Sequence, residues 1–303
     1  MLRERPIVVI AGNSQRPLGE KIAATLNLPF ELANIGSFAD GETRVGVGGE
    51  IKNATVILIQ STGPPVNDNL LVLALLADAS RAAGVRRVIA VTPYLGYCRQ
   101  DQRSSRGDPR SAQVVAKLLG AVGVDHLVTI DLHSPPLESA FPMPVTNVPA
   151  VDVFRTQLER SSQNLVVVSP DAGGIKRAQQ FATALQTRLA VVTKRRIAVD
   201  QPVAEEVLGD VHGSACLIVD DMASTGRTMV GAADALLKAG GQSIDAIFTH
   251  AVMAPGTMQR LLESPIRRLV TSDSLPEVTP HERLRVEPVG PVVAKVLQEI
   301  VER

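Results

Sequence analysis

Short apolar runs alternate along the chain with longer stretches in which apolar residues recur every three or four positions. Near-continuous runs of Val, Ile and Leu are typical of strands buried on both faces of a parallel sheet. These runs lie at 7–11, 56–60, 88–92, 127–130, 165–169, 189–193, 215–219 and 244–250. The longer stretches have the spacing of amphipathic helices and lie at 70–83, 112–122, 175–187 and 229–239. Strand and helix in turn predict an α/β fold in which mostly parallel sheets are flanked by helices.

A short segment occurs twice in the sequence. Residues 78–84 read DASRAAG and residues 234–240 read DALLKAG, and the strands that follow keep the same offset, with Val88 against Ile244. Each copy is the end of a predicted helix that a Gly terminates. An offset of about half the chain length favours a duplicated domain. Because prolines cluster just before residue 150, we expect two domains, at 1–147 and 148–303.

The composition argues against nucleic-acid binding and against a membrane span, so we expect a protein that acts on small molecules. The 303 residues carry 31 basic and 31 acidic side chains, and they include no Trp and only eight other aromatics, 2 Tyr and 6 Phe. A neutral, aromatic-poor chain is not expected to bind nucleic acid. The longest apolar run, at 70–77, is far shorter than the roughly 20 residues of a membrane span. Cys98 and Cys216 have no metal-ligand spacing, so we expect free thiols and a cytoplasmic protein.

The most informative segment follows the strand at 215–219. Asp220 and Asp221 come first, then a turn of small and hydroxyl-bearing residues at 223–228, then a helix that we expect to start near Thr228. Backbone N–H groups at a helix N-terminus bind phosphate, and neighbouring carboxylates accept hydrogen bonds from sugar hydroxyls. The segment therefore predicts a site for a phosphorylated sugar such as ribose 5-phosphate. The alternative interpretation is a solvated acidic loop that caps a helix.

This segment resembles the loop with which type I phosphoribosyltransferases and phosphoribosyl-diphosphate (PRPP) synthetases bind PRPP. Further segments resemble PRPP synthetase motifs and extend the resemblance over about 12–276. They are found at 37–42, 67–69, 93–101, 131–133, 169–174, 194–196, 209–211 and 249–250. The resemblance implies two tandem phosphoribosyltransferase-like domains. It assigns ribose 5-phosphate to Asp220, Asp221, Ala223, Ser224, Thr225, Gly226, Arg227 and Thr228.

The PRPP synthetase family transfers the β,γ-diphosphoryl group of ATP to the C1 hydroxyl of ribose 5-phosphate, giving PRPP and AMP. Displacement at phosphorus needs cations and alignment rather than a nucleophilic side chain. Lys194 and Arg196 follow a predicted strand and alternate along it, so one face of an extended segment presents both. The resemblance places these two in a catalytic loop and adds His133 as a third catalytic residue. The alternative is a solvated basic strand end.

The resemblance also implies Mg²⁺ as the cofactor, with His133 and Asp171 as its protein contacts. Both residues follow predicted strands, and the carboxyl ends of strands are where open α/β sheets gather ligands. Because Mg²⁺ keeps several waters and binds substrate phosphates, one carboxylate is enough support from the protein. The alternative for a single His at a strand end is a hydrogen-bonded structural role.

For ATP, the resemblance implies two segments. Arg99, Gln100 and Asp101 lie in a loop after a predicted strand, and Phe38, Asp40 and Glu42 match the segment that holds adenine from a neighbouring subunit. A shared site requires a homo-oligomer, which in this family is a hexamer built from dimers. The alternative interpretation of 38–42 is a polar turn with one buried ring.

Three functions are consistent with these residues. The first is an active PRPP synthetase, whose candidate groups are all present in the sequence. The second is a catalytically weak, PRPP synthetase-associated regulatory subunit. The third, a phosphoribosyltransferase that consumes PRPP, is disfavoured because such enzymes have no counterpart of the motifs in the first half.

Two segments differ from the regulated forms of the family. Gln102 replaces an Arg, and 138–142 read ESAFP where the common bacterial form has QGFFD. The resemblance implies that these regions line the site for activating phosphate and inhibitory ADP. Because Glu138 repels phosphate and fewer arginines attract it, anion binding there is weakened.

We therefore predict weak activation by phosphate and weak allosteric inhibition by ADP. The measurement is the initial rate of PRPP formation as inorganic phosphate is raised from zero, with chloride at matched ionic strength as the control. A rate that depends strongly on phosphate contradicts the prediction.

Overall fold

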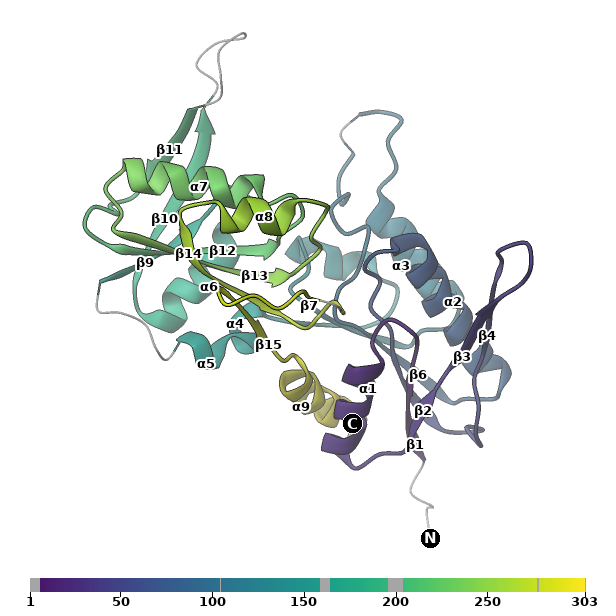
Figure 1. Cartoon of the computed structure of the whole chain (residues 1–303). Coiled ribbons are helices and arrows are strands. Elements are labelled where there is room, and N and C mark those ends of the chain that lie inside the picture. The colour runs from purple at the N-terminus through teal and green to yellow at the C-terminus, as the bar shows by residue number, and fades with distance from the viewer. Residues whose placement is uncertain (1–5, 104, 159–163, 196–203, 277, 303) are drawn as a thin grey trace. The chain divides into compact units, whose positions relative to one another are not determined.

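The computed structural model describes residues 6–103, 105–158, 164–195, 204–276 and 278–302 (Figure 1). The chain divides into two compact units. The first consists of Met1–Val148, Ser274–Pro276 and Pro288–Arg303, and the second of Pro149–Asp273 and Glu277–Glu287. Each has its own mostly parallel sheet flanked by helices, so the predicted α/β class is confirmed. Within the described chain no helix is both long and apolar enough to span a bilayer.

The first unit is built on a six-stranded parallel sheet in the order β2-β1-β5-β6-β7-β8. Its strands are β1 (Ile7–Ala11), β2 (Phe30–Leu32), β5 (Thr55–Ile59), β6 (Arg87–Thr92), β7 (His126–Ile130) and β8 (Val145–Val148). Its helices are α1 (Arg16–Leu26), α2 (Val66–Ala82), α3 (Ser111–Ala121), the 3₁₀ helix η1 (Pro135–Ala140) and α9 (Gly290–Val301). The buried side chains of α2 and α3 form one core cluster with β1, β5 and β6. β3 (Asn34–Ser37) and β4 (Thr43–Gly46) form a separate antiparallel hairpin.

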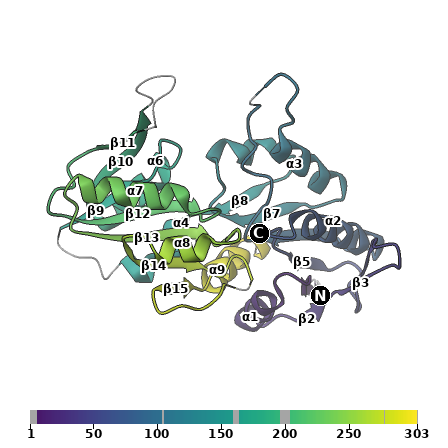
Figure 2. The ribbon, with the colours of Figure 1, turned by 45° about the horizontal axis from the view of Figure 1, so that its top comes forward.

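The second unit has a seven-stranded sheet in the order β11-β10-β9-β12-β13-β14-β15, in which only β10 and β11 pair antiparallel. The strands are β9 (Leu165–Ser169), β10 (Arg188–Arg195), β11 (Ala204–Leu208), β12 (Ala215–Met222), β13 (Ser243–His250), β14 (Ile266–Ser272) and β15 (Leu284–Glu287). The helices are α4 (Ala150–Val153), α5 (Arg155–Leu158), α6 (Ile175–Leu185), α7 (Arg227–Lys238) and α8 (Thr257–Leu262). α7 and α8 cover one face of the sheet (Figure 2). α4 and α6 meet where the rings of Phe154 and Phe181 lie 6.3 Å apart.

Continuous apolar runs form the central strands, as expected for strands with both faces covered. Every residue of β5 is buried, and β9 is buried from its second residue onward. The glycines that end the two copies of the repeat, Gly84 and Gly240, have φ of 80° and 89°. Both therefore adopt the left-handed conformation that terminates a helix and turns the chain into the next strand.

The two units repeat one topology. The order β2-β1-β5-β6-β7-β8 of the first sheet equals the order β10-β9-β12-β13-β14-β15 of the second, strand for strand in chain order. The sequence repeat covers only the ends of α2 and α7, whereas the structural repeat covers the whole of the first sheet and six strands of the second. The predicted domain at 148–303 differs from the second unit in three segments, because Val148, Ser274–Pro276 and Pro288–Arg303 belong to the first unit. The last of these segments contains α9, which packs on α1.

A buried polar network in the first unit makes Gly12 sensitive to substitution. A Cβ atom at Gly12 would lie 2.1 Å from Oε1 of Gln60. The Gln60 side chain is fully buried, accepts the Ser14 N–H at 3.3 Å, and donates to Oδ1 of Asn13 and Asn69 at 3.3 Å and 3.2 Å. It cannot move aside without losing these bonds.

We predict that Gly12→Ala lowers the free energy of unfolding by about 1–3 kcal/mol, the usual effect of overpacking a filled core. Urea unfolding followed by circular dichroism measures the change. Gly107→Ala is the matched control, because nothing lies within 4 Å of its added Cβ. Equal stability of the two variants contradicts the prediction.

Candidate active site in the second unit

The predicted sugar-phosphate segment forms a loop between β12 and α7. β12 continues through Asp220, Asp221 and Met222, three residues beyond the predicted strand end, because it stays paired with β13. α7 begins at Arg227, one residue before the expected start, and Gly226 precedes it with φ of 71°. The first N–H bonded into the helix is that of Val230, which donates to the Gly226 carbonyl at 3.0 Å. The amides of 227–229 therefore face outward at the positive end of the helix dipole.

A segment far along the chain holds the start of the loop. The N–H of Ala223 donates to the carbonyl of His250 at 3.0 Å, and the Met253 N–H donates to the carbonyl of Ala223 at 2.9 Å. His250 is the last residue of β13 and is buried. Residues 250–253 thus run beside the loop and fix the point where it leaves the sheet.

The carbonyls of the next two loop residues are tied to the same region. The Ser224 carbonyl accepts the Ala254 N–H at 2.9 Å and the hydroxyl of buried Thr257 at 2.6 Å. The Thr225 carbonyl accepts the Arg260 guanidinium at 2.6 Å. With the carbonyl side of the loop occupied, its N–H side faces the ligand position. This support was not predicted from the sequence. The feature nearest to it that was noted is the pair at 249–250, which resembles a motif of the family.

Exposure varies among the remaining predicted sugar-phosphate residues. Thr225 and Arg227 are exposed, Ser224 and Thr228 are half-buried, and Ala223 and Gly226 are buried. The hydroxyls and the Arg227 cation thus lie on the accessible side of the loop. A Cβ at Gly226 would lie 3.2 Å from Leu261, so the loop packs closely on α8. The arrangement suits a dianionic phosphate, with amides from the backbone and an additional cation at the rim.

The two acids at the end of β12 differ in environment. Asp221 is buried, and Nη2 of Arg177 lies 4.0 Å from its Oδ2. Asp220 accepts the Asp221 N–H through Oδ1 at 2.9 Å. Burial raises the pKa of Asp220 well above its usual range, and the charge of Asp221 raises it further. The pair therefore holds a proton more tightly than two exposed carboxylates would, until a ligand offers donors or a cation.

The Asp171 loop lies at the end of β9, the strand that pairs with β12. The Asp171 side chain is exposed, and its Oδ1 accepts the Gly174 N–H at 3.0 Å. The Ser169 hydroxyl donates to the Asp171 carbonyl at 2.7 Å. A Cβ at Gly174 would lie 2.8 Å from that hydroxyl, so the turn requires a glycine. Asp171 is thus a carboxylate with a fixed side chain and an accessible face.

The structure describes only part of the predicted cationic pair. Lys194 lies in β10, where its backbone is in register with Glu205 of β11, and its side chain is not described. Arg196 lies outside the described residues. Their joint action stays a prediction.

His133 lies in the first unit, two residues after an Asp131 with φ of 45°, and its side chain is exposed. Asp171 lies in the second unit, so a metal site made by both stays a prediction. Of the side chains that the structure describes, no three from His, Cys, Asp and Glu gather to hold a metal ion. Mg²⁺ keeps several waters and takes oxygen ligands from substrate, so such an ion needs few protein ligands.

The predicted adenine segment is the turn between β3 and β4. The Phe38 N–H donates to the Glu42 carbonyl at 2.8 Å, and the Glu42 N–H donates to Oδ1 of Asp40 at 3.1 Å. The Phe38 side chain is 53% exposed, so the interpretation of 38–42 as a turn with one buried ring is wrong. A rigid turn instead presents an aromatic face beside two exposed acids.

The second predicted ATP segment is fixed at the start of α3. The Gln100 side chain accepts the Ser111 hydroxyl, and its carbonyl accepts the Ala112 N–H at 3.3 Å. Arg99 is exposed and Asp101 half-buried. Burial, with a further contribution from Asp101, raises the pKa of Cys98 to about 12, so this thiol is not a nucleophile.

Comparison with known proteins gives matches for both units of the chain. Residues 7–123 match the family model described as the N-terminal domain of ribose phosphate pyrophosphokinase, and 150–267 match the phosphoribosyl transferase domain. The ribose-phosphate pyrophosphokinase of Granulibacter bethesdensis is 37% identical over 96% of both chains, and that of Clostridium tetani is 34% identical over all of this chain and 97% of its own. The chain belongs to the ribose-phosphate pyrophosphokinase family.

A solved relative agrees with this assignment. Phosphoribosylpyrophosphate synthetase from Mycobacterium smegmatis matches with a TM-score of 0.92 and 28% identity, over 98% of this chain and 99% of its own. The predicted function, a ribose-phosphate diphosphokinase that acts in nucleotide biosynthesis, is confirmed. The alternative of a PRPP-consuming phosphoribosyltransferase does not account for the matched N-terminal domain.

The first unit has no counterpart of the loop between β12 and α7 at the matching position of the described chain. Val56 pairs with Val88 as Cys216 pairs with Ile244, so Gln60 occupies the position of Asp220. There the acid pair is replaced by Gln60 and Ser61, both buried and bonded within the unit. The two helices end at matching positions, but α2 has 17 residues and α7 has 12, so α2 begins where the loop would lie. Only the second unit, among the described residues, therefore has the strand–acid–loop–helix arrangement that was predicted to bind a sugar phosphate.

The two segments that differ from the regulated forms lie together in the first unit. They border a hollow of about 530 Å³ that is lined by Asp101, Gln102, Arg103, Arg110, Gln113, Pro136, Leu137, Ser139 and Ala140. Arg103, Arg110 and Asp101 are the charged residues of this lining, and Glu138, which is not part of it, accepts a hydrogen bond from Asn147 at 3.1 Å. The hollow thus contains both signs of charge, and weak regulation by phosphate stays a prediction.

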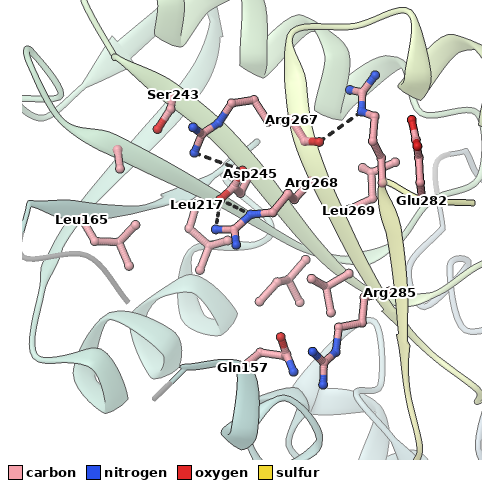
Figure 3. A pocket seen from close by; sticks show the side chains of 14 residues that line it. Gln157, Leu165, Leu217, Ser243, Asp245, Arg267, Arg268, Leu269, Glu282 and Arg285 are labelled. Atoms are coloured by element: carbon pink, nitrogen blue, oxygen red, sulfur yellow. Dashed lines mark hydrogen bonds and ion pairs between the residues drawn. The ribbon is translucent and has the colours of Figure 1, made fainter. Parts of the chain in front are cut away.

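A second hollow, of about 520 Å³, lies at the amino ends of β12 and β13, remote from the loop (Figure 3). Its cations are already paired within the chain. Arg268 donates to Asp245 at 3.1 Å and 2.6 Å, and Arg285 pairs with Glu287. The first of these pairs joins β14 to β13, and the second lies within β15.

We predict that Thr257→Val loosens the phosphate loop, because the Ser224 carbonyl loses its buried hydroxyl donor. The KM for ribose 5-phosphate should rise about two- to tenfold, the range that corresponds to about 0.5–1.5 kcal/mol for one hydrogen bond. Steady-state kinetics with each substrate varied in turn measures this. Thr279→Val, at an exposed position, is the control. An unchanged KM for ribose 5-phosphate in Thr257→Val would show that the loop does not need this support.

Proposed function

We propose that the chain transfers the β,γ-diphosphoryl group of ATP to the C1 hydroxyl of ribose 5-phosphate in the site at the end of β12. The bond from the C1 oxygen to the β-phosphorus forms, and the bond from that phosphorus to the oxygen bridging the α-phosphate breaks. AMP leaves, and the hydroxyl proton passes to solvent. The observation that carries the proposal is the loop between β12 and α7, in which the carbonyls of 223–225 accept donors from 253–260 and the amides at the start of α7 face outward, beside two acids.

The loop binds the 5-phosphate and the acids bind the sugar. Amides at the start of α7 and the hydroxyls of Ser224, Thr225 and Thr228 donate to phosphate oxygens, and Arg227 adds a cation. Asp220 and Asp221 accept hydrogen bonds from the vicinal ribose hydroxyls. The ribose is thereby held at both ends, which fixes the position of C1.

The donor chemistry of the site suits Mg²⁺. Asp171 offers an accessible carboxylate whose side chain is oriented by Gly174, and Mg²⁺ prefers oxygen ligands. When bound, the ion neutralises charge on the diphosphoryl group. We propose that Asp171 and His133 are the protein contacts, and that His133 also contacts the transferred group.

Lys194 and Arg196 are proposed to act on the transferred group. Negative charge accumulates on its oxygens in the transition state, and positioned cations are the main source of stabilisation for such displacements. The position of Lys194 near the end of β10, beside the strand that ends in the Asp171 loop, supports this role.

For ATP we propose the two segments of the first unit. The exposed ring of Phe38, with Asp40 and Glu42 beside it, suits an adenine that offers a stacking face and an exocyclic amine. Arg99, Gln100 and Asp101 form the second contact. The proposal includes a homo-oligomer, a hexamer built from dimers, in which the 38–42 turn serves the neighbouring subunit. We also propose that the protein works in the cytoplasm, in keeping with two buried free thiols.

The test is the release of AMP from ATP on addition of ribose 5-phosphate and Mg²⁺. We expect one AMP per PRPP, measured by ion-exchange chromatography. Lys194→Ala should lose about 10²–10³-fold in kcat, the usual effect of removing one group that stabilises transition-state charge. Lys238→Ala, which removes an exposed cation from the end of α7, should keep its kcat.

Two results would contradict the proposal. One is the absence of AMP release by the wild-type chain, which is also what the alternative of a catalytically weak regulatory subunit predicts. The other is an unchanged kcat in a folded Lys194→Ala protein.

A further inference from the structure

Arg177 lies at the acid pair, although the sequence did not lead us to predict a role for it there. It lies in the first turn of α6, and its side chain is only 10% exposed. Nη2 lies 4.0 Å from Oδ2 of Asp221, whose side chain is 5% exposed. Nη1 lies 3.9 Å from the position of a Cβ at Gly174. The guanidinium therefore lies between the Asp171 loop and the end of β12.

The helix that carries Arg177 does not explain a cation at this position. A helix N-terminus bears partial positive charge, which disfavours a buried cation in the first turn, and that turn contains no acidic residue. Lys176, the neighbouring cation, is exposed to solvent. A buried guanidinium needs carboxylate partners. Asp221 is the buried partner that the geometry supplies.

Asp221 in turn needs a neighbouring cation to accept hydrogen bonds well from the hydroxyls of a sugar. A buried carboxylate accepts hydrogen bonds from hydroxyls best when it is ionised and held in one orientation. Burial and the neighbouring charge of Asp221 raise the pKa of Asp220, and the charge of Arg177 acts in the opposite direction. The guanidinium thus balances part of the charge that two adjacent acids would otherwise place in a buried site.

We propose that Arg177 is a positioning residue for ribose binding, which acts through Asp221 by holding its carboxylate charged and oriented toward the ribose hydroxyls. The proposal rests on the proposed function of the acid pair. It assigns Arg177 no contact with ATP and none with the transferred group.

The test compares three variants by steady-state kinetics. Arg177→Ala should raise the KM for ribose 5-phosphate about ten- to a hundredfold, as for the loss of a charged partner, with the KM for ATP nearly unchanged. Arg177→Lys keeps the charge without the planar fork and should lie between wild type and Arg177→Ala. Lys176→Ala removes an exposed cation from the same helix turn and should behave as wild type.

A double-mutant cycle separates positioning from a general structural role. If Arg177 acts through Asp221, the KM for ribose 5-phosphate in Arg177→Ala/Asp221→Asn should equal that of Asp221→Asn alone. If the KM of the double variant instead rises by the product of the two single-variant effects, the proposal is overturned. The proposal is also overturned if Arg177→Ala lowers only kcat and thermal stability and Arg177→Lys does not restore them. If the wild-type chain releases no AMP, the proposed function has failed; if it does and Arg177→Ala keeps its KM, only this inference has failed.

Discussion

The site depends on how the carbonyl groups of the loop between β12 and α7 are satisfied. A backbone loop presents its N–H groups to an anion when its carbonyls point away from the anion and are satisfied elsewhere. Here the carbonyls of Ala223, Ser224 and Thr225 accept donors from residues 253–260, which follow β13. The parallel pairing of β12 with β13 brings the two segments together. The sheet therefore fixes which side of the loop faces a ligand.

The two units share one topology but differ at the carboxyl end of one strand. In the second unit the strand that corresponds to β5 ends in two acids and a loop, and the following helix starts late. In the first unit Gln60 and Ser61 bond within the core, and α2 starts early enough to fill the loop position. A polar strand end that is fully satisfied internally has no hydrogen-bonding capacity left for a ligand. The two units thus differ at one strand end, which presents two acids and a loop in the second unit and is bonded within the core in the first.

Much of the fold could be predicted because buried parallel strands have a strong sequence signal. The eight apolar runs lie in β1, β5, β6, β7, β9, β10, β12 and β13. The strands that were missed are mostly short, or lie at an edge, and β14 was missed because Arg267 and Arg268 interrupt its apolar pattern. Those two arginines are compatible with a strand because both pair with Asp245 of β13 across an uncovered part of the sheet.

The α/β class, the duplicated pattern and the chemical types at the site (adjacent acids, hydroxyls and a glycine before a helix) can all be inferred from the amino-acid sequence. These follow from periodicity and local backbone preference, which act over a few residues. Three features could be found only in the three-dimensional structure: Phe38 is exposed, α9 returns to the first unit, and Thr257 and Arg177 lie at the loop and at the acid pair. Such contacts join residues far apart in sequence, and they arise from strand order and helix packing, which no local pattern encodes.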